Sequence, residues 1–125
     1  MQFKETISLV LSGHKTATRR LIEAAHSALT DDAGHIVVVL FNGMPIYRVG
    51  NIYAVQPGRG LAGVGYIRLL GIERATLGDM TEADARTEGF ADLAAFRDVW
   101  TWLHGAWRLE QEVWALRFTL AEAVA

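Results

Sequence analysis

The sequence predicts an α+β fold in which a small β-barrel is flanked by helices. Residues 36–75 are rich in β-branched and aromatic side chains and are interrupted by turn residues, as expected of successive strands. Apolar residues at helical spacing precede this region in residues 3–12 and follow it in residues 81–104. A β-rich centre with helices before and after it is typical of a small α+β barrel.

Length and composition limit the class of protein. The chain has 125 residues, 12 Lys and Arg against 14 Asp and Glu, a net charge of −2 and no cysteine. This is enough for one domain with a buried core, so we treat residues 1–125 as a single domain. The longest nearly apolar stretch, residues 36–41, is far too short to span a membrane, and the N-terminus lacks the order of a secretion signal. We therefore expect a cytoplasmic protein with no membrane partner.

The N-terminal part predicts two short helices around a polar segment. Residues 3–12 carry a helical stripe of apolar side chains that Gly13 is placed to end. Residues 14–20 contain few apolar side chains and predict a loop or an irregular strand. A second short helical pattern covers residues 21–29 and is closed by the Asp- and Gly-containing residues 31–34.

The central region predicts strands joined by tight turns. Residues 37–41 and 44–48 flank Asn42-Gly43, the dipeptide best suited to a two-residue hairpin turn, and Pro45 favours an edge position. Residues 51–55 predict a further strand. Residues 61–75 predict one long bent strand with bulges, which would curl a short sheet towards a barrel.

The C-terminal part predicts two helices and a closing strand. Thr81 and Asp84 form a capping-box pattern for a helix that Gly89 would end, and residues 91–104 form a second amphipathic helix. Residues 112–120 alternate as a strand does. The side chains that we expect to face the core from this strand are Trp114, Leu116, Phe118 and Leu120.

The segment of residues 13–20 is the first candidate for chemistry. It places Lys15, Arg19 and Arg20 close to the hydroxyls of Thr16 and Thr18, directly after a helix stop. In a regular strand Lys15 and Thr18 would point to opposite faces, so their convergence requires an irregular backbone. A solvated basic loop on a nearly neutral protein is the alternative interpretation.

Glu88 is the second candidate. It is expected in the last turn of a helix, next to the negative end of the helix dipole, where a carboxylate is unfavourable by roughly 0.3–1 kcal/mol. A cation from the segment around Lys15 could compensate it. The alternative is that Glu88 pairs with a surface arginine or is solvated.

Several motifs, in this order, resemble the ASCH domain of the PUA-like superfamily of small β-barrels. They cover nearly the whole chain: Gly13-x-Lys15-x-x-Thr18-x-Arg20, Val49-Gly50-Asn51, Asp84-Ala85-Arg86-Thr87-Glu88-Gly89-Phe90, Phe96-Arg97-Asp98-Val99-Trp100 and Val113-Trp114-Ala115-Leu116-Arg117-Phe118. Small bacterial members of that family remove the acyl group from N4-acylated cytidine with a Lys-Thr-Glu triad. The resemblance implies the same amidohydrolase activity here, with Lys15, Thr18 and Glu88 as the catalytic residues.

The chemistry leaves two versions of that triad open. Thr18 could attack the amide while Lys15 takes its proton, which requires burial to lower the lysine pKa by several units. Alternatively Lys15 stays charged and polarises the carbonyl, with Glu88 orienting it or moving protons. In both versions Arg19 or Arg20 could hold sugar or base oxygens of the substrate, although a structural salt bridge is an equal alternative for either arginine.

Two other functions compete with the hydrolase. PUA-like barrels commonly bind RNA, so a non-catalytic RNA-binding module and a ribonuclease that uses the same basic cleft are the alternatives. Three cations in one short loop on a net negative chain fit a pocket for one nucleoside better than a long phosphate-tracking groove. The residues indicate no oligomeric state.

Histidines and tryptophans give weaker signals. The four histidines, which are His14, His26, His35 and His104, lack metal-ligand spacing, so we expect no metal and no cofactor, and solvated or capping roles suffice for them. The four tryptophans, which are Trp100, Trp102, Trp107 and Trp114, are expected mostly in the core. Of these, Trp107 is the candidate for a pocket wall.

Overall fold

A computed structural model describes residues 1–122. Its helices are α1 (Ile7–Leu11), α2 (Glu82–Thr87) and α3 (Leu93–His104), with a 3-10 turn, η1 (Leu77–Asp79), before α2. Its strands are β1 (Ala17–Leu21), β2 (His26–Thr30), β3 (Ile36–Phe41), β4 (Met44–Arg48), β5 (Ile52–Val55), β6 (Gly65–Thr76) and β7 (Glu112–Ala121). The predicted α+β class is confirmed.

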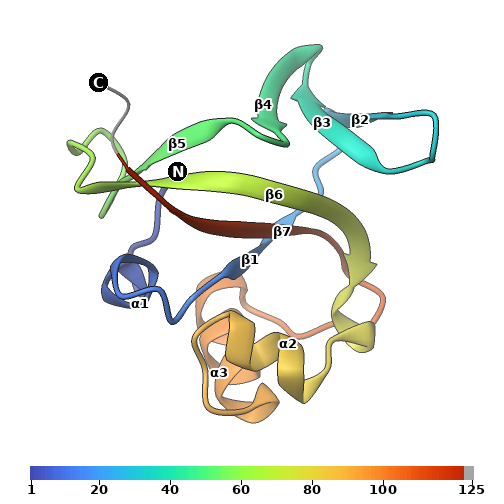
Figure 1. Ribbon diagram of the computed structural model, residues 1–125. Coiled ribbons are helices and arrows are strands. Elements are labelled where there is room, and N and C mark those ends of the chain that lie inside the picture. The colour runs from blue at the N-terminus through green and yellow to red at the C-terminus, as the bar shows by residue number, and fades with distance from the viewer. Residues whose placement is uncertain (123–125) are drawn as a thin grey trace.

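The seven strands form one curved, antiparallel sheet with the helices gathered on one side of it (Figure 1). The strand order is β1-β7-β6-β3-β2, and β4 and β5 add to β3 and β6. The longest strand, β6, pairs with β7 along most of its length, and a bulge between Leu69 and Gly71 shifts the register. Such a bulge bends and twists the strand. The sheet therefore curls in the way that a small barrel requires.

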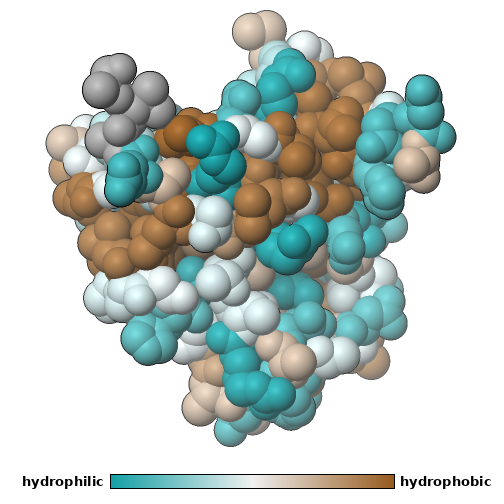
Figure 2. Space-filling view, viewed as in Figure 1, coloured by the Kyte–Doolittle hydropathy of each residue, from teal (hydrophilic) through white to brown (hydrophobic). Residues whose placement is uncertain are grey.

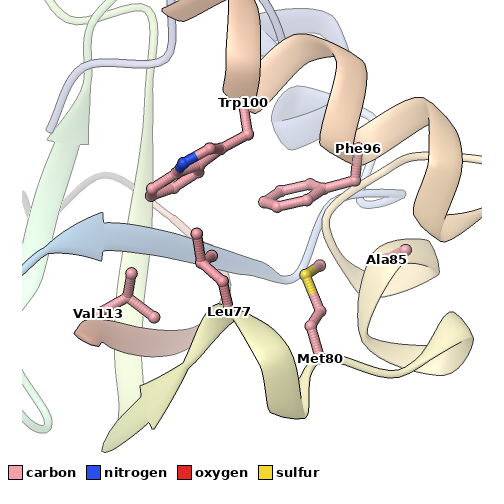
Figure 3. Close-up of a cluster of buried hydrophobic side chains, with 6 residues drawn as sticks. All are labelled: Leu77, Met80, Ala85, Phe96, Trp100 and Val113. Carbon is pink, nitrogen blue, oxygen red and sulfur yellow. The ribbon is translucent and has the colours of Figure 1, made fainter. Parts of the chain in front are cut away.

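Three apolar clusters hold the helices against the sheet. Figure 3 shows Phe96 and Trp100 pointing from α3 towards Leu77 and Met80, in a cluster that also contains Ala85 and Val113. A second cluster packs α1 against β5 to β7 through Val10, Phe3 and Phe118, and the third joins β3, β6 and β7 around Trp114. The first cluster fixes α2 and α3 beside β1, where the candidate site lies.

Most of the central and C-terminal predictions agree with the structure. β3 and β4 form the predicted hairpin, with positive φ at Asn42 and Gly43, and Pro45 lies on β4, whose only strand partner within residues 1–122 is β3. Thr81 and Asp84 form the capping box at the start of α2. The long strand β6 begins at Gly65, four residues later than predicted, and the preceding residues form a loop.

The prediction of a helix over residues 21–29 is wrong. Leu21 ends β1, where it pairs with Val113, and His26 begins β2, which pairs with β3. Leu21 packs against the cluster of α2 and α3, whereas Leu29 remains 52% exposed. The apolar residues of this segment therefore do not form one buried helical face. Pairing with distant strands overrides the local pattern.

The helix predicted over residues 3–12 is shorter than expected. Only residues 7–11 are helical, because the N–H of Phe3 donates to the Gln56 carbonyl at 2.9 Å and holds the first residues extended along β5. Phe3 and Val10 are nevertheless buried, as the stripe predicted.

Two expected core residues are on the surface. Leu120 is 44% exposed near the end of β7, and Trp102 is 72% exposed on α3, whereas Trp100 and Trp114 are buried. Figure 2 shows hydrophobic surface gathering over the region of β2 to β4 and a mainly hydrophilic surface over α2 and α3. Within residues 1–122 there is no helix with both the length and the apolar character needed to cross a bilayer.

Candidate active site

A cavity of about 530 Å³ lies between β1, the first residues of the chain and α3. Its polar lining includes all three residues of the predicted triad, Lys15, Thr18 and Glu88. These three are also the buried polar or charged residues of the described chain. The structure therefore brings together residues that are up to 73 positions apart in the sequence.

The loop between α1 and β1 positions Lys15. Gly13 follows α1 with φ of +81°, a left-handed conformation that a glycine adopts without strain. The N–H of Lys15 then donates to the Leu9 carbonyl at 2.9 Å, and the N–H of Thr16 donates to the Thr87 carbonyl at 2.8 Å. These two bonds hold Lys15 between the end of α1 and the end of α2.

The end of α2 positions Glu88. Glu88 is the C-terminal cap of α2, and Gly89 follows it with φ of +94°. A side chain at position 89 would strain this left-handed backbone, and its Cβ would lie 2.8 Å from Leu9 Cδ1, so the end of the Leu9 side chain would have to shift. The glycine allows α2 to end directly against α1, with the Glu88 side chain turned towards Lys15.

Lys15 and Glu88 form a buried ion pair. Lys15 Nζ lies 3.0 Å from Glu88 Oε1 and also donates to the Glu88 carbonyl at 3.2 Å, while the two residues are only 5% and 1% exposed. Arg19 Nη1 lies 3.2 Å from the second oxygen, Glu88 Oε2. Both carboxylate oxygens are thus occupied by cations, which explains how a carboxylate is tolerated at the end of a helix.

The hydroxyl of Thr18 belongs to the same cavity. Thr18 lies on β1, pairs with Leu116 of β7 and is 5% exposed. In the described chain the hydrogen bonds of the Lys15 ammonium go to Glu88 rather than to Thr18. The Thr18 hydroxyl is accordingly not held by the ion pair.

The proton of Lys15 is easier to remove than that of a free lysine. Burial is the main cause that lowers the pKa of Lys15, and the neighbouring Arg20 and Arg19 lower it further, whereas Glu88 opposes the shift. Lys15 and Arg19 both contact the Glu88 carboxylate, and Arg19 also lies 3.5 Å from Asp84. Arg20 adds a third cationic side chain to the cavity lining. Cations beside a reacting group favour negative charge that develops on it.

Both arginines predicted to bind substrate already have protein partners. Arg19 contacts Glu88 and lies 3.5 Å from Asp84, and Arg20 donates to the Gln2 carbonyl at 2.7 Å and lies over the Phe3 ring. Both side chains line the cavity, and the Nε atom of each is buried without a partner. Structural roles are thus established for both, and contact with substrate stays a prediction.

Further lining residues were not singled out from the sequence. Trp100 and the exposed His104, whose ring centroids are 4.1 Å apart, form part of the α3 wall. The predicted wall residue Trp107 instead packs in the cluster of α2 and α3. Only the helical periodicity of α3, which places Phe96 and Trp100 on one face, could have indicated this wall.

At the other end of the cavity lie Glu23, His26 and Tyr47. The His26 side chain is only 6% exposed, so it is not solvated as one expected role required. Its Nδ1 atom accepts a hydrogen bond from the backbone N–H of Glu23 at 3.1 Å, as a capping side chain does. Residues 1–122 contain no group of three or more His, Asp or Glu side chains arranged to hold a metal ion.

Comparison with known proteins identifies the fold. No family model and no curated protein sequence matches the chain. The structure is similar to an ASCH domain from Lactobacillus crispatus JV V101, with a TM-score of 0.61 and 18% identity over 91% of this chain and 69% of that one. It is similar to a protein from Enterococcus faecalis V583 described by the family model DUF984, with a TM-score of 0.61 and 16% identity over 94% of this chain and 68% of that one. The chain therefore has an ASCH-like fold.

Proposed function

We propose that the protein is an amidohydrolase that removes the acyl group from N4-acylated cytidine or a related acylated nucleoside, with Lys15, Thr18 and Glu88 as its catalytic residues. An ASCH-like fold is compatible with hydrolase activity and with RNA binding. The observation that carries the proposal is the buried Lys15–Glu88 pair, 3.0 Å apart, in one cavity with the Thr18 hydroxyl. Buried titratable groups in a cleft are typical of catalytic sites.

The cavity suits a substrate of this class. Its volume of about 530 Å³ lies within the range of small-molecule sites. The α3 wall and the Phe3 ring provide apolar surface for a base or an acyl group, and polar and charged side chains complete the lining. A planar base that carries an amide and a sugar matches this combination of apolar and polar groups.

In the proposed first step, the Thr18 hydroxyl oxygen attacks the carbonyl carbon of the amide, and its proton passes to neutral Lys15. The bond from the carbonyl carbon to N4 then breaks, and Lys15 returns the proton to the leaving N4. Water next attacks the resulting threonine ester and transfers a proton through Lys15, which releases the carboxylic acid and regenerates the Thr18 hydroxyl. Lys15, once protonated, and the neighbouring Arg19 and Arg20 stabilise the negative carbonyl oxygen that forms in each step.

The position of Arg19 favours Lys15 as the proton acceptor. If Lys15 loses its proton, the Glu88 carboxylate still has a cationic partner in Arg19 at 3.2 Å. The lowered pKa of Lys15 supports the same assignment, since a base whose pKa lies nearer to the working pH is present in the neutral form more often. Glu88 then orients the Lys15 amine.

Burial of the cations disfavours the RNA-binding alternative for this site. Lys15 is 5% exposed, the Arg19 side chain is 8% exposed, and both are paired with Glu88. Phosphate contacts of an RNA backbone require cations at the surface that can displace counterions. These two side chains are placed to act on a group inside the cavity.

The test is hydrolysis of N4-acetylcytidine by the purified protein, followed as release of cytidine. We expect Lys15→Ala, Thr18→Ala and Glu88→Gln each to lower kcat/KM by about 10²-fold or more, the contribution typical of such groups. Thr119→Ala, which removes an exposed hydroxyl from β7, is the matched control and should retain full activity.

Two outcomes would overturn the proposal. Full activity in any of the three variants would remove that residue from the catalytic set. Absence of cytidine release by the wild-type protein, combined with binding of single-stranded RNA that weakens steeply with salt, would establish the RNA-binding alternative.

A further inference from the structure

A second polar group occupies the end of the cavity away from the Lys15–Glu88 pair. It consists of Glu23, which follows β1, His26 at the start of β2 and Tyr47 on β4. These residues come from a turn and two strands that the mechanism above does not use. Their contacts indicate what they bind.

His26 is fixed in one orientation and one tautomer. Its Nδ1 atom accepts a hydrogen bond from the indole Nε1–H of Trp114 at 3.0 Å and another from the backbone N–H of Glu23 at 3.1 Å. Both partners are donors only, so Nδ1 must carry the lone pair and Nε2 the proton. Trp114 is buried at the centre of the sheet, which anchors the ring rigidly.

The fixed ring lies beside the carboxylate of Glu23. His26 Nε2 is 3.8 Å from Glu23 Oε2, too far for a hydrogen bond, and the Glu23 side chain is 60% exposed while the His26 side chain is 6% exposed. The carboxylate therefore has a buried ring on one side and is otherwise accessible. An accessible carboxylate suits a ligand with hydroxyl donors.

Thr18 and Glu23 line the same cavity at different ends of β1. Thr18 is the second residue of the strand, and Glu23 lies two residues beyond its last residue, Leu21. A ligand whose amide lies at Thr18 can therefore extend towards Glu23. Tyr47 adds a phenol at that second end, and burial raises its pKa, so it remains a hydrogen-bond donor.

We propose that Glu23, which lies beside His26, binds the ribose hydroxyls of the substrate, so that ribonucleosides are preferred over free nucleobases. The assignment rests on the proposed function, because it places the acylated base at Thr18. A carboxylate accepts hydrogen bonds from two vicinal hydroxyls, the same chemistry by which an acidic side chain recognises ribose in dinucleotide-binding folds. Glu23 is the binding residue, and His26 is a positioning residue.

The test compares kcat/KM for N4-acetylcytidine and for N4-acetylcytosine, which lacks the ribose. Glu23→Ala should lower kcat/KM for the nucleoside by about 10- to 100-fold, as expected for a lost hydrogen bond to a charged group, and leave the free base unchanged. The kcat/KM of Glu23→Gln for the nucleoside should lie between the values of the wild type and Glu23→Ala, because the amide oxygen accepts a hydrogen bond without carrying the charge. Glu73→Ala, an exposed glutamate of β6, is the matched control and should change neither value.

His26→Asn tests the positioning role. We expect this variant to raise KM for the nucleoside. Its kcat for the free base should remain unchanged, which would show that the fold is intact. An equal loss for both substrates, or no loss for either in Glu23→Ala, would overturn the ribose assignment while leaving the hydrolase proposal standing.

Cytidine binding by calorimetry separates the two proposals. If the wild-type protein hydrolyses neither substrate, the hydrolase proposal fails, and the binding measurement decides the ribose assignment. Cytidine that binds the wild type at least tenfold more tightly than Glu23→Ala supports the assignment, and equal binding or none overturns it.

Discussion

The backbone N–H of Thr16 donates to the carbonyl of Thr87 at 2.8 Å, and this bond joins the loop before β1 to the last turn of α2. Lys15 precedes Thr16, and Glu88 follows Thr87. A single main-chain bond therefore places the two charged side chains within reach of each other. The ion pair is therefore built on rigid backbone.

The pH dependence of activity depends on Lys15. Its pKa lies below the ordinary lysine value, mainly because of burial, so kcat/KM should rise with pH through an inflection below that of a free lysine as the ammonium loses its proton. Lys15→Arg keeps the charge and cannot release a proton, so it should be inactive at all pH values. A Lys15→Arg variant with substantial activity would show instead that the residue acts only as a fixed cation.

Removal of the buried carboxylate should destabilise the fold. In Glu88→Gln the Lys15 ammonium is left buried beside Arg19 without its anion, which should lower the free energy of unfolding by about 3 kcal/mol. The control is Glu112→Gln, which breaks the exposed Arg74–Glu112 pair at 2.8 Å and should change stability by at most about 1 kcal/mol. Urea denaturation measures both, and equal effects would show that the Lys15–Glu88 pair adds little stability.

The Thr18 hydroxyl can be removed with little change in shape. Thr18→Val keeps the volume and branching of this strand residue, so secondary structure and melting temperature should remain close to those of the wild type while hydrolysis is lost. Thr18→Ser retains a hydroxyl and should keep part of the activity. Mass spectrometry of protein quenched during turnover should detect an acyl group on Thr18, and an active Thr18→Val variant would exclude the nucleophile.

The close approach of α1 and α2 can be tested at Gly89. Gly89→Ala forces a side chain into left-handed backbone and brings its Cβ to 2.8 Å from Leu9 Cδ1, so it should lower both stability and kcat/KM by displacing Glu88. Gly105→Ala has a similar φ of +84° and no atom within 4 Å of the added Cβ. This control should lower stability by about 1 kcal/mol through backbone strain alone and leave activity unchanged.

Elements with strong local signals could be predicted from the sequence. The Asn42-Gly43 turn, the Thr81 capping box and the end of α2 at Gly89 each depend on conformational preferences of a few adjacent residues. The segment of residues 21–29 could not be predicted in this way, because its strand conformation arises from pairing with β7 and β3, which are distant in the chain.

The same distinction separates the two ends of the cavity. Lys15, Thr18 and Glu88 could be selected because a resemblance to ASCH domains and an unfavourable carboxylate at a helix end both pointed to them. Glu23 and His26 carried no such signal. The isolated histidine gains its role only from Trp114, which is 88 positions away.

The sequence by itself determined the fold class, the hairpin turn at Asn42-Gly43, the two ends of α2 and the residue types available for chemistry, because these depend on side-chain periodicity and local backbone preferences. The tertiary structure alone decided which of these residues meet in one cavity, how far the charges of Lys15 and Glu88 are from each other, and which direction the Lys15 pKa shifts. Burial and electrostatic interaction depend on distances between segments that only the folded sheet and helices bring together.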